Sequence, residues 1–284
     1  MIQNLRQIKS RIKSVESTRK ITRAMEMVSA AKLNRVRNAF YASRHYSSNL
    51  EFVLKRLLSD IDNASSPYLE KRDGSKGIAM CVIASDAGLC GTYNNNIIRA
   101  AENFINIGNR KNVKIIAIGK EVSAYFKNKG YEVARSHLGL YGRHSAKVVD
   151  DLVSELTNIF LSGTVDEVHI AYTHFSSNLR HIPAVEKFLN ISYVPEPRNY
   201  YILEPGTKAI LDRMVPRYLS AKMNTIVLDA FTAEHSARML AMKVATDNAE
   251  ELINTLTLQR NKARQAAITK EVLEIALSAE ALKE

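Results

Sequence analysis

Apolar residues recur at helical spacing near both ends of the chain. Near the start they step by three and four in three groups: Leu5, Ile8, Ile12 and Val15; Ile21, Met25 and Val28; Leu33, Val36 and Phe40. Near the other end a heptad seam runs through Ile226, Ala230, Ala233, Ala237, Leu240 and Val244. We expect residues 246–248 to interrupt this seam before it resumes at Leu252, Leu256, Ile268, Val272 and Ile275.

Both of these segments are free of residues that end helices. No glycine or proline occurs in residues 1–66 or in residues 217–284. A helix of sixty residues is about 90 Å long, whereas a compact globule of this chain length has a diameter of roughly 50 Å. The two segments therefore predict long helices that pair as an antiparallel coiled coil.

The middle of the chain follows a different pattern. Short apolar runs predict strands at residues 78–84, 113–118 and 168–172, and residues 181–190 suggest an edge strand because they contain Pro183. Helical stretches fall at residues 94–107, 120–129 and 144–162. The fold class is α/β: a coiled-coil helix at 1–66, a central Rossmann-like domain at 67–216, and a coiled-coil helix at 217–284.

The positive charge of the chain is concentrated at its start. The net charge is +11, and residues 1–60 hold thirteen Lys and Arg against four Asp and Glu, whereas residues 217–284 hold nine of each. Such a basic segment implies an acidic partner, which could be nucleic acid, anionic lipid or a carboxylate-rich protein loop. The candidate contacts are Arg6, Lys9, Arg11, Lys13, Arg19, Lys20 and Arg23.

One alternative is therefore a coiled coil that binds nucleic acid. A basic region that forks DNA continues beyond the end of its zipper, with its charges exposed. Here the basic residues alternate with the apolar positions of the helix itself. We expect no nucleic-acid partner.

A second alternative is a Rossmann-like enzyme with added helices. Gly88 and Gly91 follow the first predicted strand, where a phosphate loop would lie, but GxxxxGK[ST] and GxGxxG are both absent. A structural turn is the favoured interpretation. Cys90 has no histidine in a recognisable catalytic context, and His169 and His174 would lie on opposite faces of a strand. We expect no catalytic residue, no metal and no cofactor.

The chain shows no signal for insertion in a membrane or for export. It contains no run of eighteen apolar residues. The start, MIQNLRQIKS, proceeds directly into a helical pattern, so we expect neither a signal peptide nor a transit peptide. Two cysteines are too few for a disulfide framework and favour a reducing compartment.

Four stretches resemble the gamma subunits of F-type ATP synthases, in the order expected and over the whole length. They are residues 21–33 (ITRAMEMVSAAKL), 85–94 (SDAGLCGTYN), 234–249 (EHSARMLAMKVATDNA) and 258–275 (LQRNKARQAAITKEVLEI). The similarity is to the bacterial form, since a chloroplast-type redox insert is missing. The usual SDRGLCG carries an arginine where this chain has Ala87, which places a beta-subunit contact of that arginine in doubt.

The resemblance implies a central rotor shaft without an active site of its own. Its coiled coil would stand inside a ring of alpha and beta subunits, and its foot would sit on the ring of membrane c subunits beside the epsilon subunit. The complex would lie at the cytoplasmic face of the bacterial membrane, with this chain bound peripherally.

The resemblance also implies roles for individual residues. Arg23 and Met25 would meet an acidic loop of a beta subunit, and Arg264 and Gln265 would contact a second beta loop, the catch loop. Tyr201 and Glu204 would touch the c ring.

Overall fold

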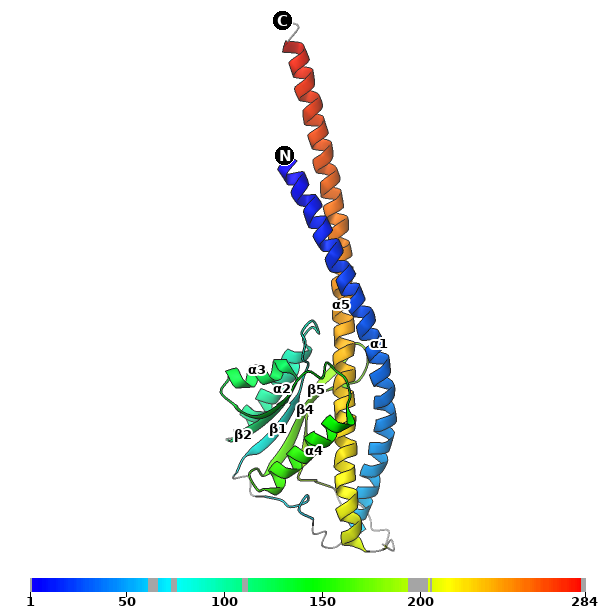
Figure 1. Cartoon of the computed structure of the whole chain (residues 1–284), viewed down its shortest axis with the longest axis vertical. Helices are drawn as coiled ribbons and strands as arrows, with labels where there is room; N and C mark the ends of the chain where they lie inside the picture. The colour runs from blue at the N-terminus through cyan, green and yellow to red at the C-terminus, as the bar shows by residue number, and fades with distance from the viewer. Residues whose placement is uncertain are drawn as a thin grey trace. The chain divides into compact units, whose positions relative to one another are not determined.

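The computed structural model describes residues 2–60, 66–72, 76–108, 112–193, 204 and 206–281. Contacts divide the chain into two compact units, Ser29–Arg238 (the central unit) and Met1–Val28 with Met239–Glu284 (the terminal coil). Helices α1 (Ile2–Asp60) and α5 (Thr207–Ala281) contribute to both units (Figure 1). Their 59 and 75 residues confirm the two long terminal helices. The division at residues 66/67 and 216/217 remains a prediction about independent folding.

The central unit contains a five-stranded sheet in the order β3-β2-β1-β4-β5. The strands are β1 (Ile78–Ile83), β2 (Val113–Ile118), β3 (Glu132–His137), β4 (Glu167–Phe175) and β5 (His181–Leu189). The first four are parallel, and β5 pairs antiparallel with β4. The α/β class and the expected edge strand are confirmed.

Helices cover both faces of this sheet (Figure 1). On one face, α2 (Tyr93–Ile107) and α3 (Lys120–Asn128) pack on Met80 and Val82 of β1. On the other face, α4 (Ala146–Leu161) and the central parts of α1 and α5 share a core with Cys81 and Ile83. Every residue of β1 is buried, which is why its sequence is apolar throughout rather than alternating.

The sequence analysis missed β3 at the edge of the sheet. Its sequence, EVARSH, contains two charged residues, and none of its side chains is fully buried. Charged residues are common on edge strands, where they discourage pairing with other chains. A search for apolar runs therefore does not detect such a strand.

Helix α5 begins ten residues before the expected start at residue 217, and Pro216 lies inside it. Proline removes the hydrogen bond to the carbonyl four residues earlier, here that of Asp212. Asp212 and Pro216 are both exposed, so this carbonyl lies on the side that faces solvent. On the opposite side Leu211, Val215 and Leu219 are buried, and their packing stabilises the helix across the proline.

Within the central unit α1 and α5 pair in antiparallel orientation. The Ser43 hydroxyl lies 2.7 Å from that of Thr225 and also accepts a 2.8 Å hydrogen bond from Asn224 Nδ2. Further along α1, Tyr46 accepts a 2.7 Å hydrogen bond from Arg217 Nε. Later residues of α1 thus meet earlier residues of α5, as the sequence predicted.

The terminal coil is also antiparallel, but its seam differs from the predicted one. Thr246 donates a 2.8 Å hydrogen bond to Thr22, and both side chains are buried. Val244 was predicted to lie in the seam but is 50% exposed, and Ile21, one of the predicted apolar positions of α1, is 61% exposed. The buried positions of α5 here are Met242, Thr246, Ala249 and Leu256.

The predicted interruption at residues 246–248 is therefore wrong, because Thr246 continues the seam. Its hydroxyl can bond to the carbonyl of Met242, one turn earlier, as well as to the facing helix. A polar residue can occupy a coiled-coil core when its hydrogen bonds are satisfied in this way. Apolar periodicity alone does not reveal such a position.

Candidate functional site

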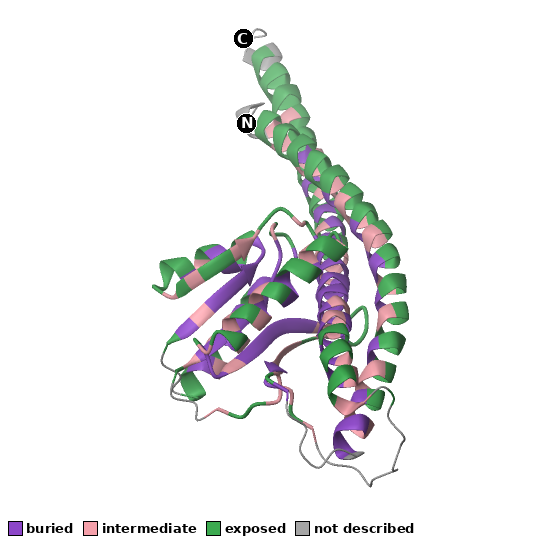
Figure 2. Ribbon diagram, turned by 60° about the horizontal axis from the view of Figure 1, so that its bottom comes forward, coloured by how far each residue is buried: buried purple, intermediate pink, exposed green. Residues whose placement is uncertain are grey.

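A ten-residue stretch of α5, residues 229–238, joins this helix to the sheet of the central unit; we call it the anchor segment. All of its residues except Ala237 are buried; in Figure 2 the ribbon of α5 is mostly purple where it passes the sheet. A helix buried on nearly every side is unusual in a small domain, since amphipathic helices expose one face. The anchor segment also contains four charged or titratable residues, and each of them has a partner.

Arg238 fixes the anchor segment to the turn after β1. Its guanidinium donates to the carbonyls of Ala87 at 2.8 Å and Gly88 at 3.3 Å, and to Oε1 of Glu234 at 2.8 Å. Arg238 and Glu234 are 8% and 1% exposed. Burial raises the pKa of Glu234, and the charge of Arg238 opposes that shift. A buried pair of this kind is costly to break, because either partner alone would be an uncompensated charge.

The turn after β1 orients the carbonyls of Ala87 and Gly88 toward Arg238. Leu89 and Gly91 both adopt positive φ, 59° and 61°, which reverses the chain before α2. The carboxylate of Asp86 accepts hydrogen bonds from the backbone N–H groups of Lys120, Gly139 and Tyr141 at 2.8–3.2 Å. The predicted structural turn is thus observed, and it is held from both sides.

Two further contacts join the anchor segment to the end of β4 and to the first residue of α2. Asp229 accepts hydrogen bonds from Nδ1 of His174 at 2.6 Å and from the backbone N–H of Phe175 at 2.8 Å. Burial nevertheless raises the pKa of Asp229. The Tyr93 hydroxyl donates to the carbonyl of Ala230 at 3.0 Å, and burial raises the pKa of Tyr93 well above its usual value.

His235 joins the anchor segment to the loop that precedes α4. Its Nε2 lies 3.1 Å from the carbonyl oxygen of Gly142, and its Nδ1 is buried with no partner among the described residues. Burial lowers the pKa of His235 to about 4, so the ring is neutral at pH 7. Gly142 has φ +66°, and a Cβ there would come within 2.5 Å of His235 Nε2. The fit between these two residues requires glycine.

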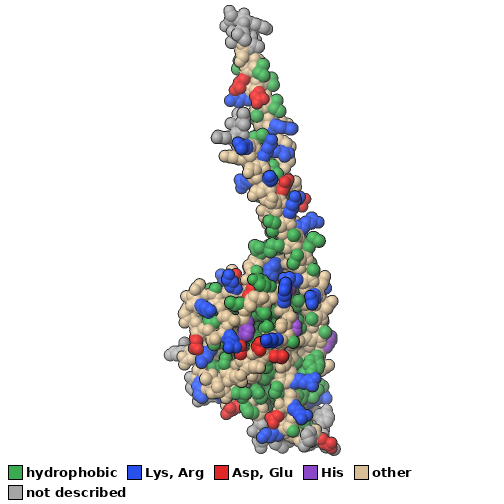
Figure 3. All heavy atoms as spheres, in the orientation of Figure 1, with side chains coloured by type: hydrophobic (Ala, Val, Ile, Leu, Met, Phe, Trp, Pro, Cys, Tyr) green, Lys and Arg blue, Asp and Glu red, His purple; other side chains and the backbone are tan. Residues whose placement is uncertain are grey.

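The terminal coil is much more exposed than the anchor segment. Lys and Arg side chains stand along its surface (Figure 3). Residues 5–15 and 252–270 contain eight basic residues and no acidic residue; the eight are Arg6, Lys9, Arg11, Lys13, Arg260, Lys262, Arg264 and Lys270. This part of the coil is the strongest candidate for contact with an acidic surface.

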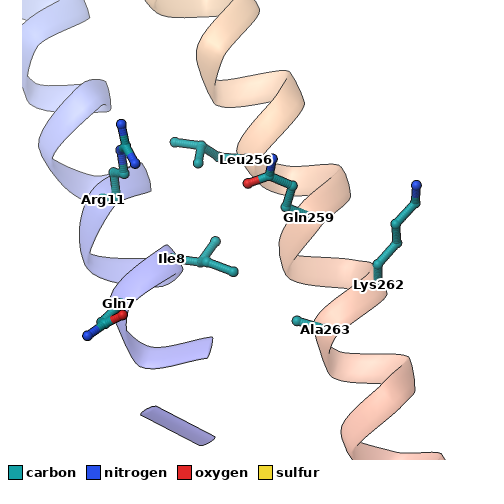
Figure 4. Close-up of a pocket in the computed structure, with 7 residues that line it drawn as sticks. All are labelled: Gln7, Ile8, Arg11, Leu256, Gln259, Lys262 and Ala263. Carbon is teal, nitrogen blue, oxygen red and sulfur yellow. The ribbon is translucent and has the colours of Figure 1, made fainter. Parts of the chain in front are cut away.

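A gap of about 440 Å³ opens between the two helices of the terminal coil (Figure 4). Ile8 and Leu256 project into it from opposite helices at different levels, and Ala263 faces it with a short side chain. Arg11 and Lys262 line the same gap. Packing between the helices is therefore thinner here than around Thr246.

The predicted partner contacts do not form one cluster. Arg23 is exposed and Met25 half-buried, close in sequence to the Thr22–Thr246 pair. Arg264 and Gln265 are exposed and follow Ala263, which lines the gap. The two pairs therefore lie at different levels of the terminal coil. Glu204 is exposed, and Tyr201 lies outside the described residues.

Six of the seven basic residues of α1 that were predicted as contacts have exposed side chains. Arg19 is half-buried and lies 3.6 Å from Glu250. Ala87 also has an exposed side chain, so the arginine usual at that position would face outward. The carbonyl of Ala87 still serves Arg238, and the turn keeps its structural role without the arginine.

Groups that could carry chemistry are engaged in packing. Burial raises the pKa of Cys90, the reverse of what an activated thiol requires. His169 packs on Phe104 of α2, whereas His174 bonds to Asp229 of α5, so the two lie on opposite faces of β4 as expected. In the described part of the chain no group of three His, Cys, Asp or Glu side chains is arranged to hold a metal, and no helix is long and apolar enough to cross a membrane.

Comparison with known proteins identifies the family. A family model described as ATP synthase matches residues 4–282. The ATP synthase gamma chain of Moorella thermoacetica is 39% identical over 282 residues, with 99% of each chain covered. That of Chloroherpeton thalassium is 36% identical, covering 99% of this chain and 98% of the relative. The chain belongs to the ATP synthase gamma chain family.

Solved structures show the same fold as this gamma chain family member. One, described as Euglena gracilis mitochondrial ATP synthase, OSCP/F1/c-ring, rotational state 3, has a TM-score of 0.73 at 17% identity and covers 99% of this chain. A Euglena gracilis rotor structure has a TM-score of 0.67 at 16% identity, over 94% of this chain. The family inferred from the four sequence stretches is confirmed.

The sequence analysis missed the anchor residues as a functional group. Glu234, His235 and Arg238 lie within residues 234–249, one of the four stretches that resemble gamma subunits, but the resemblance gave them no role. One signal was available: Glu234 and Arg238 are spaced i,i+4 inside an alanine-rich seam, where a charged pair is expensive unless it is satisfied.

Proposed function

We propose that the chain is the central rotor shaft of an F-type ATP synthase and has no catalytic role of its own. It would transmit torque between the ring of membrane c subunits and the catalytic head of alpha and beta subunits. Ion translocation would thereby be coupled to ATP synthesis or hydrolysis. The epsilon subunit would bind beside its foot, and the chain would be a peripheral protein at the cytoplasmic face of the bacterial membrane.

The anchor segment is the observation that carries this proposal. A shaft must turn together with the domain that drives it, so the joint must resist twisting. Arg238 and His235 tie α5 to the loops after β1 and before α4, and Asp229 ties it to the end of β4, through buried or partly buried hydrogen bonds. Hydrogen bonds in the low-dielectric interior are electrostatically stronger than in water, so these contacts favour one orientation of α5 against the sheet.

The exposed basic surface of the terminal coil supports the second part of the proposed function, which is contact with the catalytic head. A rotor biases its neighbours only through contacts that differ between their conformations. Those contacts must also be weak enough to break in each turn. Exposed ion pairs contribute about 0.2–1 kcal/mol each, which suits repeated attachment and release. We assign Arg23 and Met25 to one beta loop, Arg264 and Gln265 to the catch loop, and Tyr201 and Glu204 to the c ring.

Reconstitution tests the function directly. The chain is mixed with alpha and beta subunits, the complex is fixed by its head, and a bead is attached through a cysteine introduced at exposed Lys127 of α3. During ATP hydrolysis the bead should rotate in one direction in steps of one-third turn, as three beta subunits act in sequence. Stable assembly without rotation would contradict the rotor role. Failure to co-purify with alpha and beta subunits would contradict the partnership itself.

A further inference from the structure

Three loops of the central unit contact α5 near Arg238, the last residue of that unit. They are residues 86–91 after β1, residues 138–145 before α4, and residues 176–180 between β4 and β5. Each follows a strand of the parallel part of the sheet, so all three loops lie at the carboxyl edge of that sheet. We call these three loops the collar.

The collar loops meet α5 on different sides. The first accepts hydrogen bonds from Arg238, and the second lies against His235. The third accepts a 3.2 Å hydrogen bond from the Ser236 hydroxyl at the carbonyl of Asn178. Successive residues of an α-helix are rotated by about 100° around its axis, so these three side chains point in three different directions. The collar is therefore fixed around the helix.

Each collar loop also carries a large apolar side chain that is mostly exposed. Leu89 is 61% exposed, Leu138 53%, Tyr141 54% and Leu179 79%. Single apolar residues scattered over a surface are common and need no explanation. These four, however, lie on loops that are all tied to residues 235–238 of one helix. They therefore mark a candidate interaction surface.

Two of the four residues also adopt an unfavourable backbone conformation. Leu89 has φ 59° and Tyr141 has φ 49°, in the left-handed region that favours glycine. The other non-glycine residue with positive φ in the described part of the chain is Asn112, a type that tolerates this region. Strain at Leu89 and Tyr141 is not offset by burial of their side chains within the chain. Contact with a partner explains such residues better than folding does.

The free charges of the collar are basic. Arg143 and Arg180 are exposed, and neither has an ion-pair partner among the residues that the structure describes. The acidic residue of these loops is Asp86, and its carboxylate already accepts three backbone hydrogen bonds. A surface of this kind is complementary to one that combines apolar and acidic side chains.

We propose that the collar docks on the catalytic head, against a segment that combines apolar and acidic side chains. This inference rests on the proposed function, which assigns the terminal coil to the same head. Helix α5 passes from the collar directly into the terminal coil after Arg238. Apolar contacts have no preferred direction, so they can slide as the shaft turns, whereas each ion pair must break.

Photocrosslinking in the complex of the full chain with alpha and beta subunits identifies the occupant. A benzophenone probe is attached to the chain through Leu179→Cys; the native Cys81 and Cys90 are buried, which directs labelling to the new thiol. Illumination should join the chain to an alpha or beta subunit. Ile107→Cys, 87% exposed at the end of α2, is the control and should not give this product.

The double variant Leu89→Gly with Leu179→Ser tests what the apolar side chains contribute. Glycine adopts positive φ without strain, and Leu179 is exposed, so the urea midpoint of the isolated chain should not fall. Affinity for the head, titrated with fluorescently labelled chain, should fall at least about tenfold, since burial of one large apolar side chain contributes that much. Ile107→Ser is the matched control and should leave the affinity unchanged.

Arg180→Glu tests the acidic character of the partner. Reversal of this charge places like charges opposite one another, so binding to the head should weaken, and added salt should reduce the difference from the unmodified chain. Tighter binding of Arg180→Glu would show that the partner surface is not acidic.

Two further results would overturn the docking surface. One is a complex that assembles and rotates but gives no crosslink from residue 179 to alpha or beta, or a crosslink to epsilon or c subunits instead. The other is equal affinity of the double variant and Ile107→Ser. Both leave the rotor function intact. Failure of the unmodified chain to assemble with alpha and beta subunits would refute the proposed function, and the docking surface with it.

Discussion

The anchor segment and the terminal coil belong partly to the same helix, α5, yet they are stabilised in different ways. In the anchor segment nine of ten residues are buried, and each charged or titratable side chain has at least one partner inside the protein. In the terminal coil a narrow seam holds two helices together, and most side chains face outward. The comparison indicates a division of labour: one part of the helix is fixed in place, and the other presents a surface.

The two regions can be measured separately in one sample. All twelve tyrosines lie between residues 29 and 238, and the chain has no tryptophan. Tyrosine fluorescence therefore reports on the central unit, whereas hydrogen exchange of peptides from residues 239–281 reports on the terminal coil.

The largest effect is expected from Arg238→Met. It leaves Glu234 buried without its cation and removes the donors to the carbonyls of Ala87 and Gly88. The free energy of unfolding should fall by about 3–5 kcal/mol, measured by urea unfolding with tyrosine fluorescence. Arg264→Met, the same change at an exposed position of α5, is the control and should change it by less than about 0.5 kcal/mol. Similar losses of stability in both variants would contradict the stabilising role of the Arg238 contacts.

Acid should weaken the anchor through His235. Its pKa is about 4 in the native state because of burial, against about 6.5 in the unfolded chain. Between these values the unfolded state binds more protons, so the free energy of unfolding falls with decreasing pH, by up to roughly 3 kcal/mol, and the loss is complete below the native pKa. Asp229 and Glu234 oppose this trend, since burial raises their pKa values.

Comparison with His235→Gln isolates the histidine contribution. The difference in the free energy of unfolding between the two proteins, followed from pH 7 to pH 4, removes the carboxylate contributions that both share. The variant should lose less stability over this range than the unmodified chain. Parallel curves would show that His235 does not carry the pH dependence.

A smaller effect is expected in the terminal coil from Thr246→Ala. The change removes a buried methyl group and the hydrogen bond to Thr22, at a cost of about 1 kcal/mol. Hydrogen exchange around residue 246 should become about fivefold faster, whereas tyrosine fluorescence should show no change. Thr255→Ala is the matched control at an exposed position; it should slow exchange slightly, because alanine favours helix.

Charge reversal on the coil surface should affect function but hardly stability. Arg23→Glu should change the free energy of unfolding by less than about 0.5 kcal/mol because Arg23 is exposed, and Met25→Glu should lower it by up to about 1 kcal/mol because Met25 is half-buried. In the assembled enzyme the yield of ATP per ion translocated should fall, because repulsion replaces attraction to the acidic beta loop. An unchanged yield would remove both residues from that contact.

The smallest change in stability is expected for Arg264→Ala with Gln265→Ala. Both side chains are exposed and alanine favours helix, so the coil itself should be unaffected. ATP hydrolysis by the reconstituted head should become slower. Lys270→Ala, a basic residue farther along α5, is the control, and equal rates in all three proteins would contradict the catch-loop assignment.

The fold was largely predictable because its strongest signals are local. Two helices without glycine or proline, and apolar runs at β1, β2 and β4, each follow from neighbouring residues. The misses depend on tertiary context. Edge strand β3 is too polar to detect, Pro216 lies inside a helix that packing stabilises, and Thr246 occupies the seam through a hydrogen bond to a residue 224 positions away.

The candidate site shows the same difference between residues that local sequence identifies and residues that depend on tertiary context. Basic residues on the terminal coil were evident from charge alone, since exposure is the default state of Lys and Arg. The roles of Asp229, His235 and Arg238 depend on partners in β4 and in two loops that lie 55 to 151 residues away in the sequence. No local pattern identifies which loop will meet which turn of a helix.

The pairing of Ser43 with Thr225 has a consequence for how the chain is made. The two residues are 182 positions apart, so at 5–20 residues per second α1 leaves the ribosome roughly 10–40 s before its partner helix is available. During that interval the side of α1 that carries Phe40, Leu54 and Leu58 lacks α5, which completes the same core. The synthesis rate therefore limits how soon the two helices can pair.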